Sequence, residues 1–245
     1  MQRSKIEYLR GPDGREGFTW NPLTMRCSRI SAGCKNCWHL RFADRHKSNP
    51  TFSDKARAAY AGGPAYLDRD ELMEPRHRGG HSKIAVQFMG DLFHESVSDD
   101  ELNAIFFEML TTPSHTFLIL SKRVQRMHDF LNRKPPKGYG NWPFENVWVG
   151  GSVEDMISAE KIIPLIRDIP AKVRWISVEP MLQYFPRAIW TGIHWVVCGA
   201  ETGPHKRPCR QEWIDDLRTG CLNAGVKFFG KVDSSGAAIM PREMP

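Results

Sequence analysis

Short apolar runs alternate with amphipathic segments from residue 83 onward, and this alternation is the feature that most constrains the fold. The expected strands are residues 84–89, 116–120, 147–149, 173–178, 193–198 and 226–229. The segments between them carry apolar residues at helical spacing, and Ser98 and Glu101 form a capping box at the start of the first. Because strands that alternate with helices of about 10–15 residues form βαβ units, the sequence predicts an α/β fold with parallel strands.

Each predicted strand ends in a small or charged polar cluster. In chain order the clusters contain Gly90 and Asp91; Ser121, Lys122 and Arg123; Ser152 and Glu154; Glu179; Glu201; and Gly230 and Lys231. Ligands of parallel α/β sheets bind at this edge, so we expect a polar cavity there. Any single cluster also suits an ordinary turn with a helix cap, and Ser152 is expected to cap the helix that follows it.

Three of the six cysteines lie within eleven residues. Cys27, Cys34 and Cys37 have C-x6-C-x2-C spacing after a short predicted strand at 18–20, and Gly33 allows a tight turn between them. A [4Fe–4S] cluster takes four ligands, so three thiolates would leave one iron open. The main alternative is structural zinc, with His39 or a distant histidine as the fourth ligand. A disulfide with a spare thiol, or burial as small apolar residues, would also explain the cysteines.

Composition places the chain among ordinary globular proteins. It has 245 residues, 41% hydrophobic and 25% charged, and one domain over residues 1–245 is expected. No apolar run has the length of a membrane span and the N-terminus does not read as a signal peptide. We therefore expect a cytoplasmic protein with reduced cysteines and no membrane partner. The charged, irregular stretch 48–81 is expected to be a surface insertion or a lid that gates substrate.

The ordered set of motifs resembles the radical SAM superfamily and, more narrowly, the phage Gp37/Gp68-type proteins. Besides the Cys loop, the resemblance rests on residues 4–7 (SKIE), 19–22 (TWNP), 91–95 (DLFHE), 121–123 (SKR), 151–155 (GSVED), 178–180 (VEP), 199–203 (GAETG) and 242–245 (REMP). It implies a partial (β/α)6-type barrel with the Cys loop after the first strand. The six-residue gap is longer than the usual three, and the aromatic residue follows the third cysteine instead of preceding it. Residues 8–17 and 232–238 also depart from the narrower family.

The resemblance implies a cofactor pair and a chemistry. Cys27, Cys34 and Cys37 would bind a [4Fe–4S] cluster whose fourth iron is chelated by S-adenosylmethionine. An electron from a flavodoxin- or ferredoxin-type donor would then cleave the cofactor to a 5′-deoxyadenosyl radical, which abstracts a hydrogen from substrate.

The resemblance also implies roles for the residues at the strand ends. Gly90 and Asp91 would hold the methionyl ammonium, and Lys122 or Arg123, next to Ser121, would pair with the methionyl carboxylate. Ser152 and Glu154 would reach the ribose, and Trp38 would stack on adenine. Glu179 and Glu201 would face substrate.

Basic residues suggest the substrate class. Six Lys or Arg lie between 122 and 137, residues 205–210 add more of the same sign, and the net charge is +6. This pattern fits DNA or a nucleotide, although a solvated helix face would explain the same residues. The phage resemblance favours hypermodification or rearrangement of a nucleobase, with the base flipped out of a duplex.

Two other functional classes fit parts of the sequence. A non-catalytic, zinc-stabilised adaptor that binds nucleic acid would use the Cys loop and the basic residues. A metal-dependent hydrolase would use Asp91, Glu154, Glu179 and His94, and would leave the Cys loop unexplained.

Overall fold

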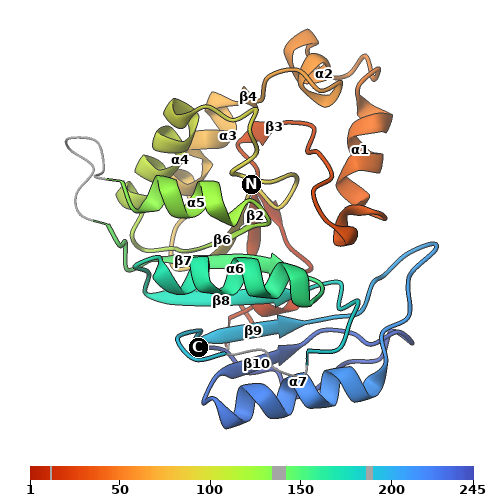
Figure 1. The fold of residues 1–245 in the computed structure, drawn as a ribbon. Coiled ribbons are helices and arrows are strands. Elements are labelled where there is room, and N and C mark those ends of the chain that lie inside the picture. Colours follow the sequence, from red (N-terminus) through yellow and green to blue (C-terminus); the bar gives the residue numbers. More distant parts are fainter. Residues whose placement is uncertain (12, 134–141, 186–189) are drawn as a thin grey trace.

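The computed structural model describes residues 1–11, 13–133, 142–185 and 190–245. An eight-stranded sheet runs through the molecule in the order β1-β2-β5-β6-β7-β8-β9-β10 (Figure 1). Its strands are β1 (Gln2–Arg3), β2 (Phe18–Trp20), β5 (Lys83–Val86), β6 (Thr116–Ser121), β7 (Val147–Val153), β8 (Val173–Val178), β9 (Trp195–Cys198) and β10 (Lys227–Gly230). Among the described strands of this sheet, β1 is antiparallel to its neighbour, and β2 and β5 to β10 pair in parallel in chain order. The α/β fold with parallel strands is therefore confirmed.

Four helices cover one face of this sheet. They are α4 (Asp99–Thr111), α5 (Val124–Leu131), α6 (Met156–Asp168) and α7 (Gln211–Asn223), and Figure 1 shows α6 lying over β7 and β8 and α7 beside β10. Their buried residues join every second strand residue in one large core, for example Ile105, Ile166 and Leu217 with Ile119 and Ile176. The helical spacing read from the sequence therefore marks the faces that pack on the sheet.

The opposite face of the sheet carries a smaller core built around Tyr8, in the short 3-10 helix η1 (Glu7–Leu9). The Tyr8 ring centroid lies 5.3 Å from that of Trp195, 5.7 Å from Phe229 and 6.1 Å from Trp175. These rings come from three adjacent strands, so the segment before β2 closes this face with aromatic contacts.

The residues that cap α4 and α6 confirm one predicted cap and correct another. Ser98 and Glu101 form the predicted capping box of α4. Ser152 does not cap α6, because β7 continues through Val153 and the cap is Asp155, whose carboxylate accepts a 2.8 Å hydrogen bond from the amide of Ser158. Ser152 is therefore a strand residue, placed at the carboxyl end of β7.

The stretch 48–81 was expected to be irregular, and this is wrong. It contains α2 (Asp54–Tyr60), β4 (Tyr66–Leu67), α3 (Arg69–Met73) and the 3-10 helix η3 (Glu74–His77), and β4 pairs with β3 (Leu23–Thr24). The guanidinium of Arg76 donates from Nε to both carboxylate oxygens of the buried Glu108, at 2.8 and 2.6 Å. Trp20 also donates a 2.8 Å hydrogen bond to the carbonyl of Glu71. These distant partners fasten the second half of the stretch to the sheet and to α4.

Within the described ranges, no helix is both long and apolar enough to cross a membrane.

The crowding at Gly150 gives a test of the core. A Cβ at this position in β7 would lie 2.3 Å from Cε2 of Trp175. We expect Gly150→Ala to lower the free energy of unfolding by about 1–3 kcal/mol, because a buried indole in a filled core must move. Urea denaturation measures this. Gly79→Ala is the control, since a Cβ there meets nothing within 4 Å; equal losses in both variants would contradict the packing described.

Candidate functional site

The Cys loop lies over the carboxyl ends of the parallel strands. It runs from the end of β3 through the 3-10 helix η2 (Ala32–Cys34) to α1 (Trp38–His46), and Figure 1 shows η2 at the end of the sheet to which the strand arrows point. Cys34 is buried, and Cys27 and Cys37 are half-buried; all three are free thiols. The other cysteines, Cys198, Cys209 and Cys221, are buried in the core around β9 and α7.

Arg123, after β6, makes several contacts with this loop. Its guanidinium donates to the hydroxyl of Ser28 at 2.6 Å, to the carbonyl of the same residue at 3.4 Å, and to the sulfur of Cys27 at 3.6 Å. It also pairs with Asp91 at 3.2 Å and with Glu95 at 2.7 Å. The side chain is only 9% exposed, so one buried cation joins the Cys loop to two carboxylates.

Asp91, after β5, accepts hydrogen bonds from protein groups with both of its carboxylate oxygens. One oxygen accepts from the Ser121 hydroxyl at 2.6 Å and from the Phe93 amide at 3.0 Å, and the other accepts from the Lys122 amide and from Arg123. The preceding Gly90 has a φ of 128°, and a Cβ there would lie 2.7 Å from Sδ of Met25. The strand end therefore fits closely against the chain that enters the Cys loop.

Glu154, after β7, holds the middle of the loop. One carboxylate oxygen pairs with the ammonium of Lys122 at 2.6 Å, and the other accepts a hydrogen bond from the amide of Gly33 at 3.1 Å. Its side chain is 1% exposed. A Cβ on Gly33 would lie 3.1 Å from Nζ of Lys122, so the loop approaches this ion pair closely. This contact, not a positive φ, is what makes glycine suitable at position 33.

Glu201, after β9, fixes the far side of the loop. Its carboxylate accepts from Arg207 at 2.5 and 2.9 Å and from the side-chain amide of Asn36 at 3.1 Å. The hydrogen bonds from Arg207 lower the pKa of Glu201 from the usual 4.5 to about 2. Arg207 also donates to the carbonyl of Ala32 at 2.9 Å. In sequence Arg207 was one member of a basic cluster, and nothing there identified its partner.

Glu179, after β8, makes a separate ion pair. Its carboxylate lies 2.7 Å from the ammonium of Lys231 and accepts a 3.0 Å hydrogen bond from the Ser177 hydroxyl. The charge of Glu179 raises the pKa of Lys231 and contributes to the raised pKa of Tyr8, which is due mainly to burial. This pair therefore belongs to the side of the sheet that η1 covers.

Two aromatic residues follow the third cysteine. Trp38 is the first residue of α1 and 52% of its surface is exposed. Its ring centroid lies 6.0 Å from that of His39. His39 is 3% exposed, and neither ring nitrogen has a hydrogen-bond partner in the described part of the chain. Burial lowers the pKa of His39, so it is held as a neutral ring.

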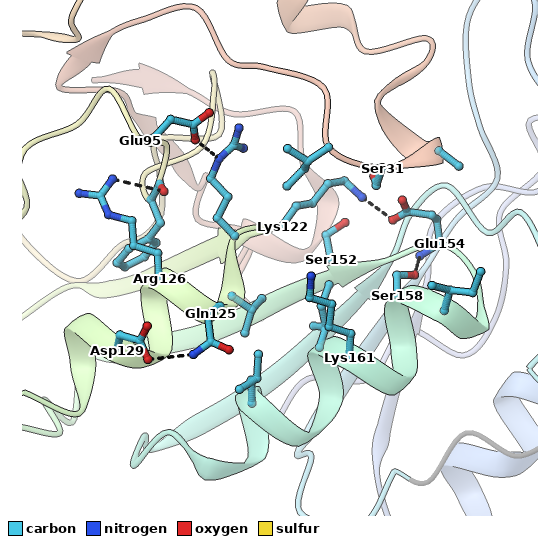
Figure 2. Close-up of a pocket in the computed structure, with 18 of the residues that line it drawn as sticks. Ser31, Glu95, Lys122, Gln125, Arg126, Asp129, Ser152, Glu154, Ser158 and Lys161 are labelled. Carbon is cyan, nitrogen blue, oxygen red and sulfur yellow. Dashed lines mark hydrogen bonds and ion pairs between the residues drawn. The ribbon is translucent and has the colours of Figure 1, made fainter.

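A pocket of about 720 Å³ opens beside the loop, between residues 30–32, α5 and α6 (Figure 2). Four of the predicted site residues line it: Lys122, Arg123, Ser152 and Glu154. The three cysteines, Trp38, Asp91, Glu179 and Glu201 are not among its lining residues. The strand ends therefore form two regions, the anchored Cys loop and this adjacent pocket.

The residues of the hydrolase alternative are not gathered at one point. Glu154 pairs with Lys122, Glu179 with Lys231 and Asp91 with Arg123. His94 contacts the hydroxyls of Ser96 at 2.8 Å and Ser28 at 3.1 Å. Across the described ranges, no three His, Cys, Asp or Glu side chains form a group that could hold one metal ion.

The basic residues are largely engaged. Arg126 donates to the carbonyls of His94 and Val97 and to Asp99, and Arg133 pairs with Asp99 at 2.5 Å. Lys134 and Lys137 lie outside the described residues.

These features define an α/β protein whose Cys loop is bound across the carboxyl ends of a parallel sheet. Residues 3–237 match the family described as "Protein of unknown function (DUF5131)", and the chain belongs to that family. No curated protein and no solved structure matches the chain.

Loss of the Arg123 guanidinium tests the anchoring of the loop. We expect Arg123→Met to lower the free energy of unfolding by about 3 kcal/mol, because Asp91 would keep a buried charge without its partner. We also expect faster tryptic cleavage after Arg26 or Arg29. In the control Arg133→Met, loss of an exposed pair should cost about 0–1 kcal/mol. Equal effects of the two variants would refute the anchoring role.

The depressed pKa of Glu201 predicts how stability depends on pH. A carboxylate with a folded-state pKa of about 2, against the usual 4.5, stabilises the fold above pH 4.5 and loses that contribution as the pH falls toward 2. The free energy of unfolding of Glu201→Gln should therefore fall less steeply across this window. Urea titrations at several pH values measure the slope. A Glu160→Gln variant, which changes an exposed carboxylate on α6, should keep the wild-type slope; an unchanged slope in Glu201→Gln would contradict the prediction.

Proposed function

We propose that this chain is a radical S-adenosylmethionine enzyme built on a partial (β/α)6-type barrel. The observation that carries the proposal is the Cys loop, whose three free thiols lie over the carboxyl ends of the strands. Arg123, Glu154 and Glu201 bind its backbone and side chains from three different strand ends. A loop fixed in this way presents its sulfurs where α/β proteins bind their ligands.

The donor set fits a [4Fe–4S] cluster. Cys27, Cys34 and Cys37 would each bind one iron, and the remaining cysteines lie in the core, so no fourth thiolate is at hand. A structural zinc ion would need a fourth protein ligand besides these three thiolates, such as His39 or a distant histidine. With S-adenosylmethionine on the open iron, such a cluster supplies a 5′-deoxyadenosyl radical on one-electron reduction.

Residues at the rim would bind the cofactor and keep the loop in place. We propose that Asp91 binds the methionyl ammonium and Lys122 binds the methionyl carboxylate. Asp91 would give up part of its contact with the Lys122 amide, and Lys122 part of its contact with Glu154. The exposed ring of Trp38, next to Cys37, is the surface proposed for adenine stacking. Glu201 is fully engaged with Arg207 and Asn36, so we assign it to positioning the loop instead of contacting substrate.

Glu179 remains the candidate for the substrate side. It is paired with Lys231, and both side chains are about a quarter exposed or less. The net charge of +6 supports a polyanionic substrate such as DNA or a nucleotide, and reduction would come from a flavodoxin- or ferredoxin-type donor.

Anaerobic reconstitution with iron and sulfide tests the proposal. We expect a brown protein with broad absorption near ~400 nm, and formation of 5′-deoxyadenosine when S-adenosylmethionine and a reductant are added. Cys27→Ser, Cys34→Ser and Cys37→Ser should each lose both signals.

Cys209→Ser is the matched control, because this buried thiol lies outside the loop and should leave both signals intact. A colourless protein with one zinc per chain would refute the radical mechanism and would identify the zinc-stabilised adaptor.

A further inference from the structure

The pocket beside the Cys loop has hydrogen-bond donors with no acceptors. One group of these donors lies at the start of α5. Arg123 occupies the N-cap position there, and its side chain makes no capping hydrogen bond to the helix. Within the described ranges, the backbone amides of Val124, Gln125 and Arg126 donate to no acceptor, and all three residues line the pocket. An uncapped helix N-terminus carries a partial positive charge and attracts anions.

Ser152 supplies a second, independent observation. It lines the same pocket, is only 5% exposed, and its hydroxyl has no hydrogen-bond partner in the described part of the chain. Because Ser152 lines the pocket, its hydroxyl can donate a hydrogen bond to a ligand there. Lys161, on α6, adds an ammonium without a carboxylate partner among the described residues. Figure 2 shows both side chains pointing from β7 and α6 toward the Cys loop.

The acidic residues of the pocket do not offset these donors. Glu95 accepts from Arg123 and Glu154 from Lys122. Asp155 caps α6, and Asp129 accepts from Gln125 at 2.9 Å. Because these carboxylates already accept hydrogen bonds from the chain, the free donors of the pocket remain available to a ligand that is rich in hydrogen-bond acceptors.

The rest of the pocket suits an apolar body. Ile30 on the Cys loop is 48% exposed and Ile157 on α6 is 80% exposed, and both line the pocket. Three amides, a hydroxyl and an ammonium exceed what the two oxygens of a carboxylate require and match a phosphate, which helix N-termini bind readily. The volume of about 720 Å³ is ample for a small organic ligand.

We infer that this pocket binds a small organic phosphate, with the phosphate at the start of α5 near Ser152 and Lys161 and the body against Ile30 and Ile157. A nucleoside monophosphate has this chemistry. The inference extends the proposed function, because it locates the phosphate of the proposed nucleotide substrate, and it assigns Ser152 to this ligand instead of the cofactor ribose. The site itself needs no cluster.

Calorimetric titration with 5′-deoxynucleoside monophosphates and inorganic phosphate tests the site. We expect at least one nucleotide to bind, and the corresponding nucleoside to bind at least about tenfold more weakly, because charge-assisted hydrogen bonds are lost. Gln125→Glu should also reduce nucleotide affinity at least about tenfold, since it places a carboxylate at the anion site while suiting the helix dipole. Lys161→Met and Ser152→Ala should weaken nucleotides and leave nucleosides unaffected.

Matched controls exist for the charge changes. Gln211 begins α7, which also lacks a side-chain cap, and it donates to Asp215 as Gln125 donates to Asp129. Gln211→Glu and Lys172→Met should therefore leave binding unchanged. Failure of all these phosphates to bind, equal binding of nucleoside and nucleotide, or equal effects of pocket and control variants would overturn the site.

The cysteines separate this inference from the proposed function. Nucleotide affinity should be unchanged in the Cys27→Ser, Cys34→Ser, Cys37→Ser triple variant, and binding that required the thiols would contradict the site. A chain that binds nucleotides and forms no cluster would uphold this site and reject the radical mechanism.

Discussion

Charge-assisted hydrogen bonds between the strand ends and the Cys loop are the interaction on which the rest of the site depends. The loop has short secondary structure and little core of its own, so its conformation is set by groups outside it. Arg123, Glu154 and Glu201 reach it from different strand ends and bind at Ser28, Gly33 and Asn36. Because Arg123 and Glu154 are almost completely buried, their bonds are little screened by water, and losing one partner leaves an uncompensated charge.

The sheet makes this arrangement possible by delivering these side chains to one edge. Parallel pairing in chain order places the carboxyl ends of β5 to β9 next to one another, although the chain between them is long. The strands are held from both faces, by the helices on one side and by the aromatic rings around Tyr8 on the other. Gly150 shows how closely this second face is packed, since Trp175 occupies the space of its missing side chain. A rigid frame of this kind can keep several charged groups at fixed separations.

Local pattern was enough to predict most of the frame, and its failures have identifiable causes. The strand expected at 84–89 ends at Val86 because Gln87 takes a φ of 53°, and its side-chain amide bonds both backbone groups of Leu23. Apolar periodicity cannot reveal such a change of direction. The stretch 48–81 looked irregular because its stabilising partners, such as Glu108 for Arg76, are distant in sequence. The residue types at the strand ends were predictable, but their pairings were not, since each depends on how the loop folds back.

The pairings divide the charged rim into groups that hold the protein together and groups left for a ligand. The carboxylates of Asp91 and Glu201 accept several hydrogen bonds from the chain, including those from Arg123 and Arg207. A ligand that displaced Arg123 or Arg207 completely would break an ion pair and loosen the Cys loop, so the ammonium proposed for Asp91 would replace only part of its contacts. Ser152 and the amides that open α5 require no such exchange, because they donate to nothing in the described chain. A ligand therefore binds at the rim with the least loss of existing hydrogen bonds in the pocket beside the loop. It would lose the most at the residues whose hydrogen bonds hold the Cys loop and its thiols in place.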